Sequence, residues 1–271
     1  MTPTPSLIVI ALLLSPAAGA QHDHSQHAPP ESAAASSSHV APDPPSHPME
    51  PMTGEQMVQL MEMNDAARFG AVSIDRLEWR ERTDEVGWEA TAWYGGDHNK
   101  LVLKTEGEYS DDNDRVRNEA LWDHVVARWW SLQSGVRYDS GSGPSRTWAA
   151  LGMQGLAPYW FDVDATFYVG DAGRTALRAE ARYDLRLTQR LILQPQLELN
   201  LYGKNDPQRQ LGSGLSDLRA GLRLRYEVRR EFAPYIGVHF NALFGETADL
   251  AQAAGNHDTE TQFVAGIRFW F

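Results

Sequence analysis

The chain has 271 residues, a formal net charge of -12, 42% hydrophobic residues and no cysteine. The negative charge, without a basic stripe to offset it, argues against nucleic-acid binding, and the lack of cysteine excludes a disulfide-stapled scaffold and thiolate chemistry. A mean hydropathy of -0.45 does not exclude a membrane protein, because a β-barrel hides a polar lumen behind an apolar belt.

Residues 1–20 have the pattern of a secretory signal peptide. An apolar run from Leu7 to Leu14 is followed by the small residues AGA at 18–20, although no Lys or Arg precedes the run. We therefore expect the mature chain to begin at Gln21. No later apolar run is long enough for a spanning helix, so membrane insertion would have to be by strands.

Residues 21–52 are predicted to be a disordered tail, because Pro, Ser, Ala and His dominate and large aliphatic residues are almost absent. Five of the nine histidines fall in this tail, and five of the seven methionines fall in residues 21–63. Imidazole binds Cu(II), Zn and Ni, and thioether selects Cu(I), so this segment could hold copper in either oxidation state. The candidate metal ligands are His22, His24, His27, His39, His47, Met49, Met52, Met57, Met61 and Met63.

Residues 53–69 are predicted to form a short helix or plug segment. Thr53 can cap the helix, with Gln56 as its capping-box partner, and the following apolar residues fall on one face. Met57 and Met61 could therefore be apolar packing residues rather than ligands, and the histidines of the tail could be incidental to a low-complexity composition.

Residues 70–271 show a period of two, which predicts an all-β domain. The predicted strands are long for a soluble domain and suit tilted membrane strands. We therefore predict an antiparallel outer-membrane β-barrel of about twelve strands. Their ranges are 71–80, 88–96, 100–109, 117–126, 129–139, 146–157, 159–169, 174–187, 190–202, 215–229, 232–243 and 261–271.

The predicted connections alternate between short and long. This is the asymmetry of outer-membrane barrels, and it places both termini on the periplasmic side. Trp and Tyr near the predicted strand ends would form the interface girdles: Trp79, Trp88, Trp93, Tyr94, Trp129, Trp130, Tyr159, Trp160 and Trp270. The alternative is a secreted β-sandwich, which has no reason to alternate its loop lengths so regularly.

The predicted lumen face carries both signs of charge, which favours a self-paired network that fills the barrel over a cation path. Its members are Asp162, Asp164, Arg178, Glu180, Arg182, Asp184, Arg186, Glu198, Arg219, Arg223, Arg225, Glu227 and Arg268. Pro195 lies within a predicted strand and removes one ladder donor, so we expect a bulge there.

An enzyme is not expected. The sequence has no nucleophile elbow, HExxH motif or Gly-rich phosphate loop. A rim dyad of His239 with Asp217 or Ser216 stays open as an alternative, although the spacing gives it no support.

Several blocks of the sequence closely resemble the copper resistance protein B family, from about residue 50 to the end. They are residues 88–108 (WEATAWYGGDHNKLVLKTEGE), 146–160 (RTWAALGMQGLAPYW), 161–175 (FDVDATFYVGDAGRT), 185–204 (LRLTQRLILQPQLELNLYGK), 212–235 (GSGLSDLRAGLRLRYEVRREFAPY) and 261–271 (TQFVAGIRFWF). The resemblance implies an outer-membrane barrel of a periplasmic copper-resistance system, acting beside a multicopper oxidase of the same system.

The resemblance also implies a copper-binding N-terminal part, and it supports His22, His24, His27, Met49 and Met52 as ligands. The tail is short and has no long run of Met-rich repeats, so its expected capacity is low. We therefore expect the tail to bind copper and to pass it to or from the barrel lumen, rather than to store it in bulk. The alternative is a general porin or structural barrel in the outer-membrane lipid, with incidental metal binding.

Overall fold

The computed structural model describes residue 53 and residues 67–81, 85–109 and 114–271. The chain divides into two units, residues 1–57 and 58–271, and the strands belong to the second. The predicted signal peptide, the tail and most of the predicted helix or plug segment lie outside the described residues. In the part of the chain that is described, no helix is both long and apolar enough to cross a membrane.

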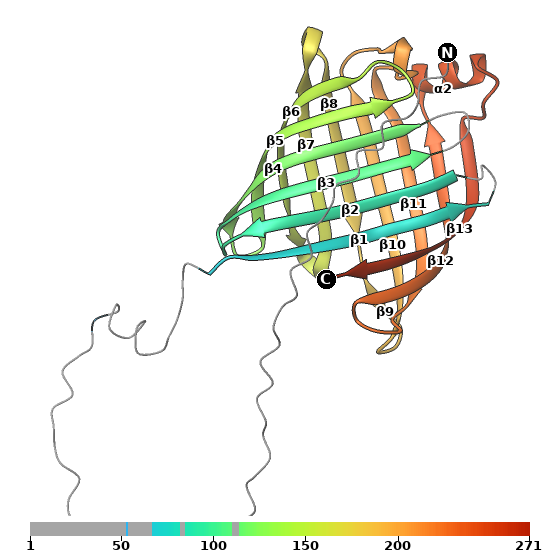
Figure 1. Cartoon of the computed structure of the whole chain (residues 1–271). Coiled ribbons are helices and arrows are strands. Elements are labelled where there is room, and N and C mark those ends of the chain that lie inside the picture. The colour runs from blue at the N-terminus through green and yellow to red at the C-terminus, as the bar shows by residue number, and fades with distance from the viewer. Residues whose placement is uncertain (1–52, 54–66, 82–84, 110–113) are drawn as a thin grey trace, which may run out of the picture. The chain divides into compact units, whose positions relative to one another are not determined.

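The described chain forms one antiparallel sheet (Figure 1). Four short helices lie in its connections: η1 (Pro158–Trp160), η2 (Asp171–Gly173), η3 (Pro207–Arg209) and α2 (Gly245–Ala253). The strands are β1 (Phe69–Arg80), β2 (Glu85–Gly95), β3 (Asn99–Tyr109), β4 (Arg115–Ala127), β5 (Trp130–Gly141), β6 (Arg146–Ala157), β7 (Phe161–Gly170), β8 (Thr175–Arg182), β9 (Leu185–Arg186), β10 (Leu191–Tyr202), β11 (Gly214–Tyr226), β12 (Phe232–Leu243) and β13 (Thr259–Trp270).

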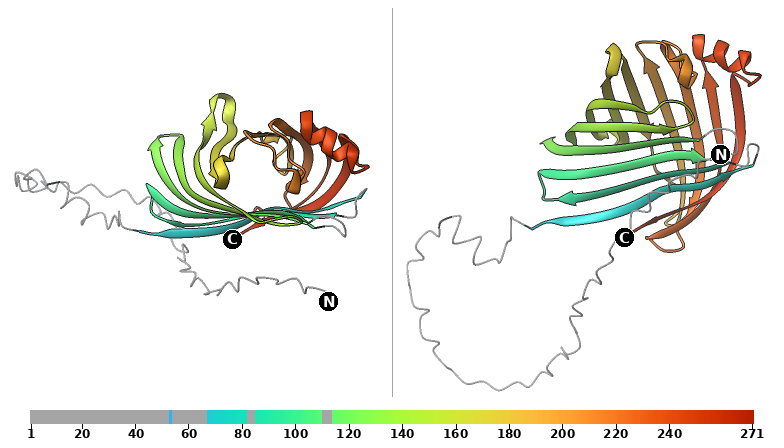
Figure 2. Two further views of the ribbon diagram at one scale, coloured as in Figure 1. Left: turned by 90° about the horizontal axis from the view of Figure 1, so that it is seen from above. Right: turned by 45° about the horizontal axis from the view of Figure 1, so that its top comes forward.

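The sheet closes on itself, because β1 pairs with β13 and β10 pairs with both β8 and β11. The short β9 also pairs with β10, in the register set by β8, so β8 and β9 are two parts of one strand. The fold is therefore a closed antiparallel barrel of 12 strands, and the predicted fold class is confirmed. Figure 2 shows the strands curving round to enclose the lumen.

Side chains alternate between the two faces of the barrel, as the period of two predicts. In β11, for example, Leu222 is exposed on the outside, whereas Arg223 is buried inside. The outer face carries the large apolar side chains, among them Leu103, Leu151, Phe167, Leu197, Ile236 and Phe263. This pattern of an apolar exterior and a charged interior is that of a membrane barrel.

The connections at the two ends differ in length, as predicted. One end carries the short turns 96–98, 128–129, 158–160, 187–190 and 227–231, together with the start of β1 and the end of β13. The other end carries the longest loops, 203–213 and 244–258, and helix α2, which contacts β11. We call these the short-turn end and the long-loop end.

The predicted bulge at Pro195 is wrong. The register between β10 and β11 runs through Pro195 without a shift, and β8 and β9 keep one register against β10. Tyr183 N donates to Pro195 O at 3.1 Å. Proline cannot return the second bond of this pair, and the ladder between β8 and β9 is interrupted here instead.

Three other details differ from the sequence prediction. Strand β7 begins at Phe161 rather than at 159, because Tyr159 and Trp160 have φ angles of 67° and 68° and form part of the turn. Trp93 lines the lumen and does not belong to an outer girdle. Helix α2 occupies a stretch for which only a loop was expected.

Candidate functional site

The ten predicted metal ligands, His22 to Met63, all lie outside the described residues. Within the described chain, no group of three or more His, Cys, Asp or Glu side chains is placed to hold a metal ion. The remaining methionine of the mature chain, Met153, is exposed on β6, and its cross-strand partners Leu132 and Ala165 belong to the outer face. The described barrel therefore offers no thioether ligand to its lumen.

Two of the described histidines lie at neighbouring positions of the short-turn end. His98 lies in the β2–β3 turn and its O accepts a hydrogen bond from Val125 N at 3.0 Å, while His124 Nδ1 lies 2.9 Å from Asn99 Oδ1 and its ring stacks on Trp122. His239 is buried in β12, and His257 lies in the loop before β13.

The alternative rim dyad is not assembled. His239 pairs with Gly221 of β11, four residues along the strand from Asp217, which corresponds to about 13 Å. Ser216 Oγ instead lies 3.0 Å from Thr247 Oγ1 of α2. Asp217 accepts a hydrogen bond from Asn200 and pairs with Arg219, so neither residue can orient or use the imidazole.

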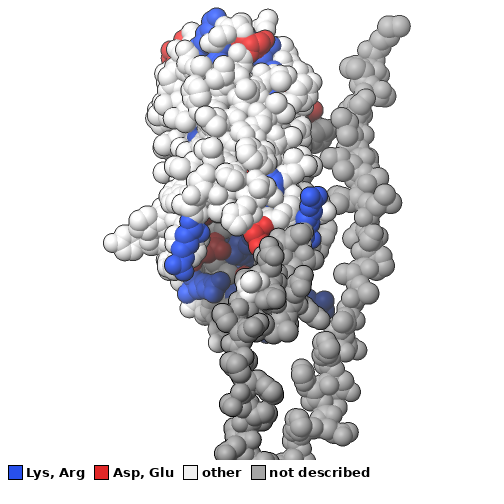
Figure 3. All heavy atoms as spheres, turned by 90° about the vertical axis from the view of Figure 1, so that its left-hand side faces the viewer, with Lys and Arg blue, Asp and Glu red and all other residues white. Residues whose placement is uncertain are grey.

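The main cavity of the barrel has a volume of about 680 Å³ and is lined by side chains of both charge signs. Residues of the short-turn end lie at its mouth, including Trp160, Asp184 and Arg268. Glu106 and Arg178 lie at its inner end. Figure 3 shows this hollow, with Lys, Arg, Asp and Glu side chains inside it and around it. We call this cavity the vestibule.

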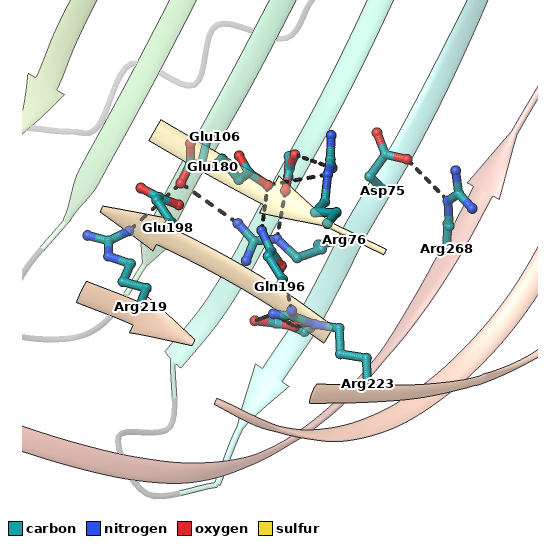
Figure 4. Close-up of polar contacts among 12 residues, drawn as sticks. Asp75, Arg76, Glu106, Glu180, Gln196, Glu198, Arg219, Arg223 and Arg268 are labelled. Atoms are coloured by element: carbon teal, nitrogen blue, oxygen red, sulfur yellow. Dashed lines mark hydrogen bonds and ion pairs between the residues drawn. The ribbon is translucent and has the colours of Figure 1, made fainter. Parts of the chain in front are cut away.

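A β-bulge in β1 sets the wall of the vestibule. The register against β2 shifts between Ile74 and Arg76, so Asp75 is an extra residue in the strand. Consecutive strand residues normally face opposite sides, yet both Asp75 and Arg76 line the vestibule. Asp75 Oδ1 lies 3.1 Å from Arg268 Nε of β13, across the seam between the first and last strands (Figure 4).

Arg178 of β8 is the centre of the ion-pair network at the inner end of the vestibule. Its Nη2 lies 3.0 Å from Glu106 Oε2, 3.0 Å from Glu198 Oε2 and 3.3 Å from Glu180 Oε2. Arg76 Nε lies 2.8 Å from Glu89 Oε2 on the neighbouring strand. These groups come from five strands and cross the lumen (Figure 4).

A second network lies on the β1–β11–β12 side of the lumen. Arg223 contacts Glu78 through two nitrogens, with Nη2 3.0 Å from Glu78 Oε2 and Nε donating to the same carboxylate. Tyr235 donates to Glu78 at 3.2 Å, and Arg80 links Glu78 to Glu108. Glu78 and Arg223 are each 2% exposed, so this pair is sealed from water.

Beyond the inner end of the vestibule, toward the long-loop end, the lumen is filled by packed side chains. Arg137 forms a two-bond pair with Asp139, and Trp148 donates to the same carboxylate at 2.9 Å. Tyr168 packs beneath Arg137 and donates to Glu119 at 2.7 Å. Trp148, Tyr168 and Leu121 belong to one buried apolar cluster. In the described part of the chain, this part of the lumen is therefore occupied by buried side chains.

Asp206 ties the outer loops together at the long-loop end. Arg146 Nε lies 2.9 Å and Arg174 Nε 3.4 Å from Asp206 Oδ2. Burial alone would raise the pKa of Asp206, but the hydrogen bond from Arg146 and the charges of both arginines hold the pKa below its ordinary value.

The predicted self-paired lumen network is confirmed in its main members. Arg178, Arg182, Arg219, Arg223, Arg225 and Arg268 are each paired with a carboxylate. Sequence reasoning missed Glu78, Arg80, Glu89 and Glu106. In β1 the bulge at Asp75 interrupts the period of two, whereas Glu89 and Glu106 lie in strands without a bulge and could have been found from the alternation. The carboxylates at the inner end are committed to arginines and hydrogen-bond donors, so they are poor ligands for a metal ion.

A sequence profile described as copper resistance protein B precursor matches residues 68–271. A copper resistance protein B from Escherichia coli is 44% identical over 243 residues, covering 82% of each chain. A copper resistance protein B homolog from Pseudomonas syringae pv. tomato is 42% identical over 258 residues, covering 92% of this chain and 86% of the homolog.

The chain is similar in fold to a solved porin. The NanC porin has a TM-score of 0.50 at 11% identity and covers 73% of this chain and 98% of its own. The KdgM porin has a TM-score of 0.47 at 13% identity and covers 74% of this chain and 99% of its own. At these identities the likeness concerns the fold alone.

Proposed function

The chain belongs to the copper resistance protein B family, and we propose that residues 21–63 bind copper and pass it to or collect it from the vestibule of the barrel. The family gives the chain a role in copper resistance, and its barrel is of the outer-membrane type. In this proposal copper is the cargo of the protein.

The observation that carries this proposal is where the copper-binding side chains lie. His22, His24, His27, His39, His47, Met49, Met52, Met57, Met61 and Met63 are concentrated before the barrel. Imidazole and thioether are the ligands that suit Cu(II) and Cu(I), whereas guanidinium-paired carboxylates are not. Within the described residues, no three His, Asp or Glu side chains are grouped to hold a metal ion, which supports copper capture by the tail.

The start of the barrel and the mouth of the vestibule lie at the same end of the barrel. The chain enters the barrel at Phe69, at the short-turn end, which is also the end where the vestibule opens. The buried side chains beyond the inner end narrow the lumen on the β4–β7 side. The position of the vestibule mouth supports exchange of copper with the tail at the short-turn end.

We place the short-turn end in the periplasm, because short periplasmic turns and long external loops are the rule in outer-membrane barrels. A periplasmic multicopper oxidase of the same system would then meet the tail and the mouth of the vestibule. The tail would exchange copper quickly with such a partner, because its ligands are not fixed in a closed site.

Copper titration of the full-length protein in detergent tests the proposal. The wild type is expected to bind Cu(I) and Cu(II) at micromolar concentration or tighter. A variant with the five histidines changed to Ala should lose Cu(II) binding, and one with the five methionines changed to Leu should lose Cu(I) binding. His98→Ala with His257→Ala is the matched control and should bind as the wild type does. Unchanged binding in both tail variants would remove the tail from the proposal.

A further inference from the structure

We propose that two adjoining turns at the short-turn end form a binding site for the headgroup of an anionic phospholipid. The turns are residues 187–190, between β9 and β10, and 227–231, between β11 and β12. They carry Arg190, Arg229 and Arg230, all exposed. Glu227 N of the second turn donates to Arg190 O of the first at 2.8 Å, so the two turns lie side by side.

These arginines differ from those of the lumen in having no carboxylate partner. Within the described residues, Arg190, Arg229 and Arg230 form no ion pair and no side-chain hydrogen bond. By contrast, Arg225 of strand β11 pairs with Asp184 and Glu227. The exposed Glu231 reduces the positive charge of the site without cancelling it. Guanidinium groups that are not used within the protein are available to an external anion, and phosphate matches their geometry.

The second turn is held rigidly in place. Arg229 and Phe232 exchange both backbone hydrogen bonds, at 3.2 Å each. Trp270 N donates to Glu231 O at 3.0 Å, and its indole Nε1 donates to Arg230 O at 2.8 Å. The backbone that carries Arg229 and Arg230 is therefore fixed before a ligand arrives, which lowers the entropy cost of binding.

Apolar side chains exposed beside these turns identify a lipid as the ligand. Leu187 adjoins the first turn, Val228 and Phe232 adjoin the second, and Trp270 is half-exposed next to them. Trp at a strand end is typical of the membrane interface, and basic residues there attract anionic headgroups. A phosphate on the arginines with acyl chains along Leu187, Val228 and Phe232 satisfies both features of the surface.

The leaflet depends on the proposed orientation. With the short-turn end in the periplasm, the site faces the phospholipid leaflet, so phosphatidylglycerol and cardiolipin are the lipids that fit. The site does not depend on copper binding, and the two proposals can therefore fail separately.

The test is lipid retention by the full-length protein, measured by native mass spectrometry after reconstitution in phosphatidylcholine nanodiscs containing phosphatidylglycerol. The wild type should retain phosphatidylglycerol in preference to phosphatidylcholine, and added salt should reduce the preference because the contact is electrostatic. Arg190→Gln, Arg229→Gln and Arg230→Gln should each lower the preference by about fivefold. Glu231→Gln should raise it.

The matched control changes basic residues at the long-loop end, Arg115→Gln with Lys204→Gln, and should keep the wild-type preference. Barrel integrity of each variant is checked by circular dichroism and by its heat-dependent gel migration. Equal retention of both lipids by the wild type overturns the proposal. A variant with all three arginines changed that keeps the wild-type preference also overturns it, and this is the result expected if the arginines bind an acidic protein instead. A failed copper titration leaves these outcomes unchanged.

Discussion

At the residue scale, the lumen contains charged side chains whose burial costs free energy when they are unpaired and is offset when they form ion pairs. Glu78 accepts hydrogen bonds from Arg223 and Tyr235 and contacts Arg80, so nearly all of its acceptor capacity is used. Such a pair is favourable only with good geometry and full hydrogen bonding. Because their acceptor capacity is already used, these carboxylates are unsuitable for exchanging a metal ion.

Removing one partner of this pair should destabilise the barrel strongly. Glu78→Ala leaves the Arg223 guanidinium buried without its counter-charge and is expected to cost about 3–5 kcal/mol of unfolding free energy. Glu78→Gln keeps part of the hydrogen bonding and should cost less. Urea unfolding in detergent, followed by tryptophan fluorescence, gives both values.

The matched control is Asp171→Asn, which breaks an exposed ion pair with Arg174. It should change the unfolding free energy by less than about 1 kcal/mol, since exposed pairs contribute little. Similar losses of unfolding free energy for Glu78→Ala and Asp171→Asn would contradict the view that burial makes the loss of Glu78 costly.

The lumen charges of β8, β10 and β11 follow from the sequence, since their strands alternate cleanly between apolar and charged residues. Asp75 and Arg76 do not, because no rule of alternation places two consecutive residues on one face. Their common direction depends on the register of β1 against β2 and β13, which is a property of the closed sheet.

At the element scale, the strands are more predictable than their connections. The period of two predicted all twelve strands, including the two parts β8 and β9 as one segment. The predicted starts of β1, β2, β4, β7 and β13 differ from the observed ones by two or three residues. Helix α2 was missed because a nine-residue helix has little periodicity of its own. It is placed by tertiary contacts, among them Thr247 with Ser216 and with the backbone N–H of Gly212.

The loop of residues 203–213 should loosen in acid. The pKa of Asp206 is lowered in the folded protein, so its contribution to stability is present above the ordinary value of 3.8 and is lost as the pH falls through the folded pKa. Protonation releases Arg146 and Arg174 from the loop. Pepsin cleavage within 203–213 is therefore expected to accelerate as the pH is lowered below 3.8.

Asp206→Asn should be cleaved rapidly throughout the acid range, because the carboxylate is already absent. Asp249→Asn in α2 is the control and should follow the wild-type pH profile. A wild-type cleavage rate that does not depend on pH once corrected for pepsin activity would show that the ion pairs do not hold the loop.

At the scale of the whole molecule, the proposal assigns different roles to the barrel and to the tail. The barrel contributes a closed wall and a vestibule that opens at the short-turn end, whereas the side chains proposed to bind copper precede it in the chain. The sequence predicted the outer-membrane barrel and the copper-resistance family, and both are confirmed. It could not predict the ion pairs across the lumen, which depend on how side chains from many strands meet inside the barrel.

We propose that residues 21–52 are needed for copper resistance and that the barrel alone is not sufficient. Growth in graded copper of cells that depend on this protein measures this need most directly, comparing the wild type with a deletion of residues 21–52 that keeps residues 1–20 and the barrel. Equal amounts of both proteins in the outer membrane are confirmed first. The deletion is expected to reduce copper tolerance to the level of cells without the protein. Full copper tolerance of the deletion strain would contradict this expectation and would favour a structural role for the barrel.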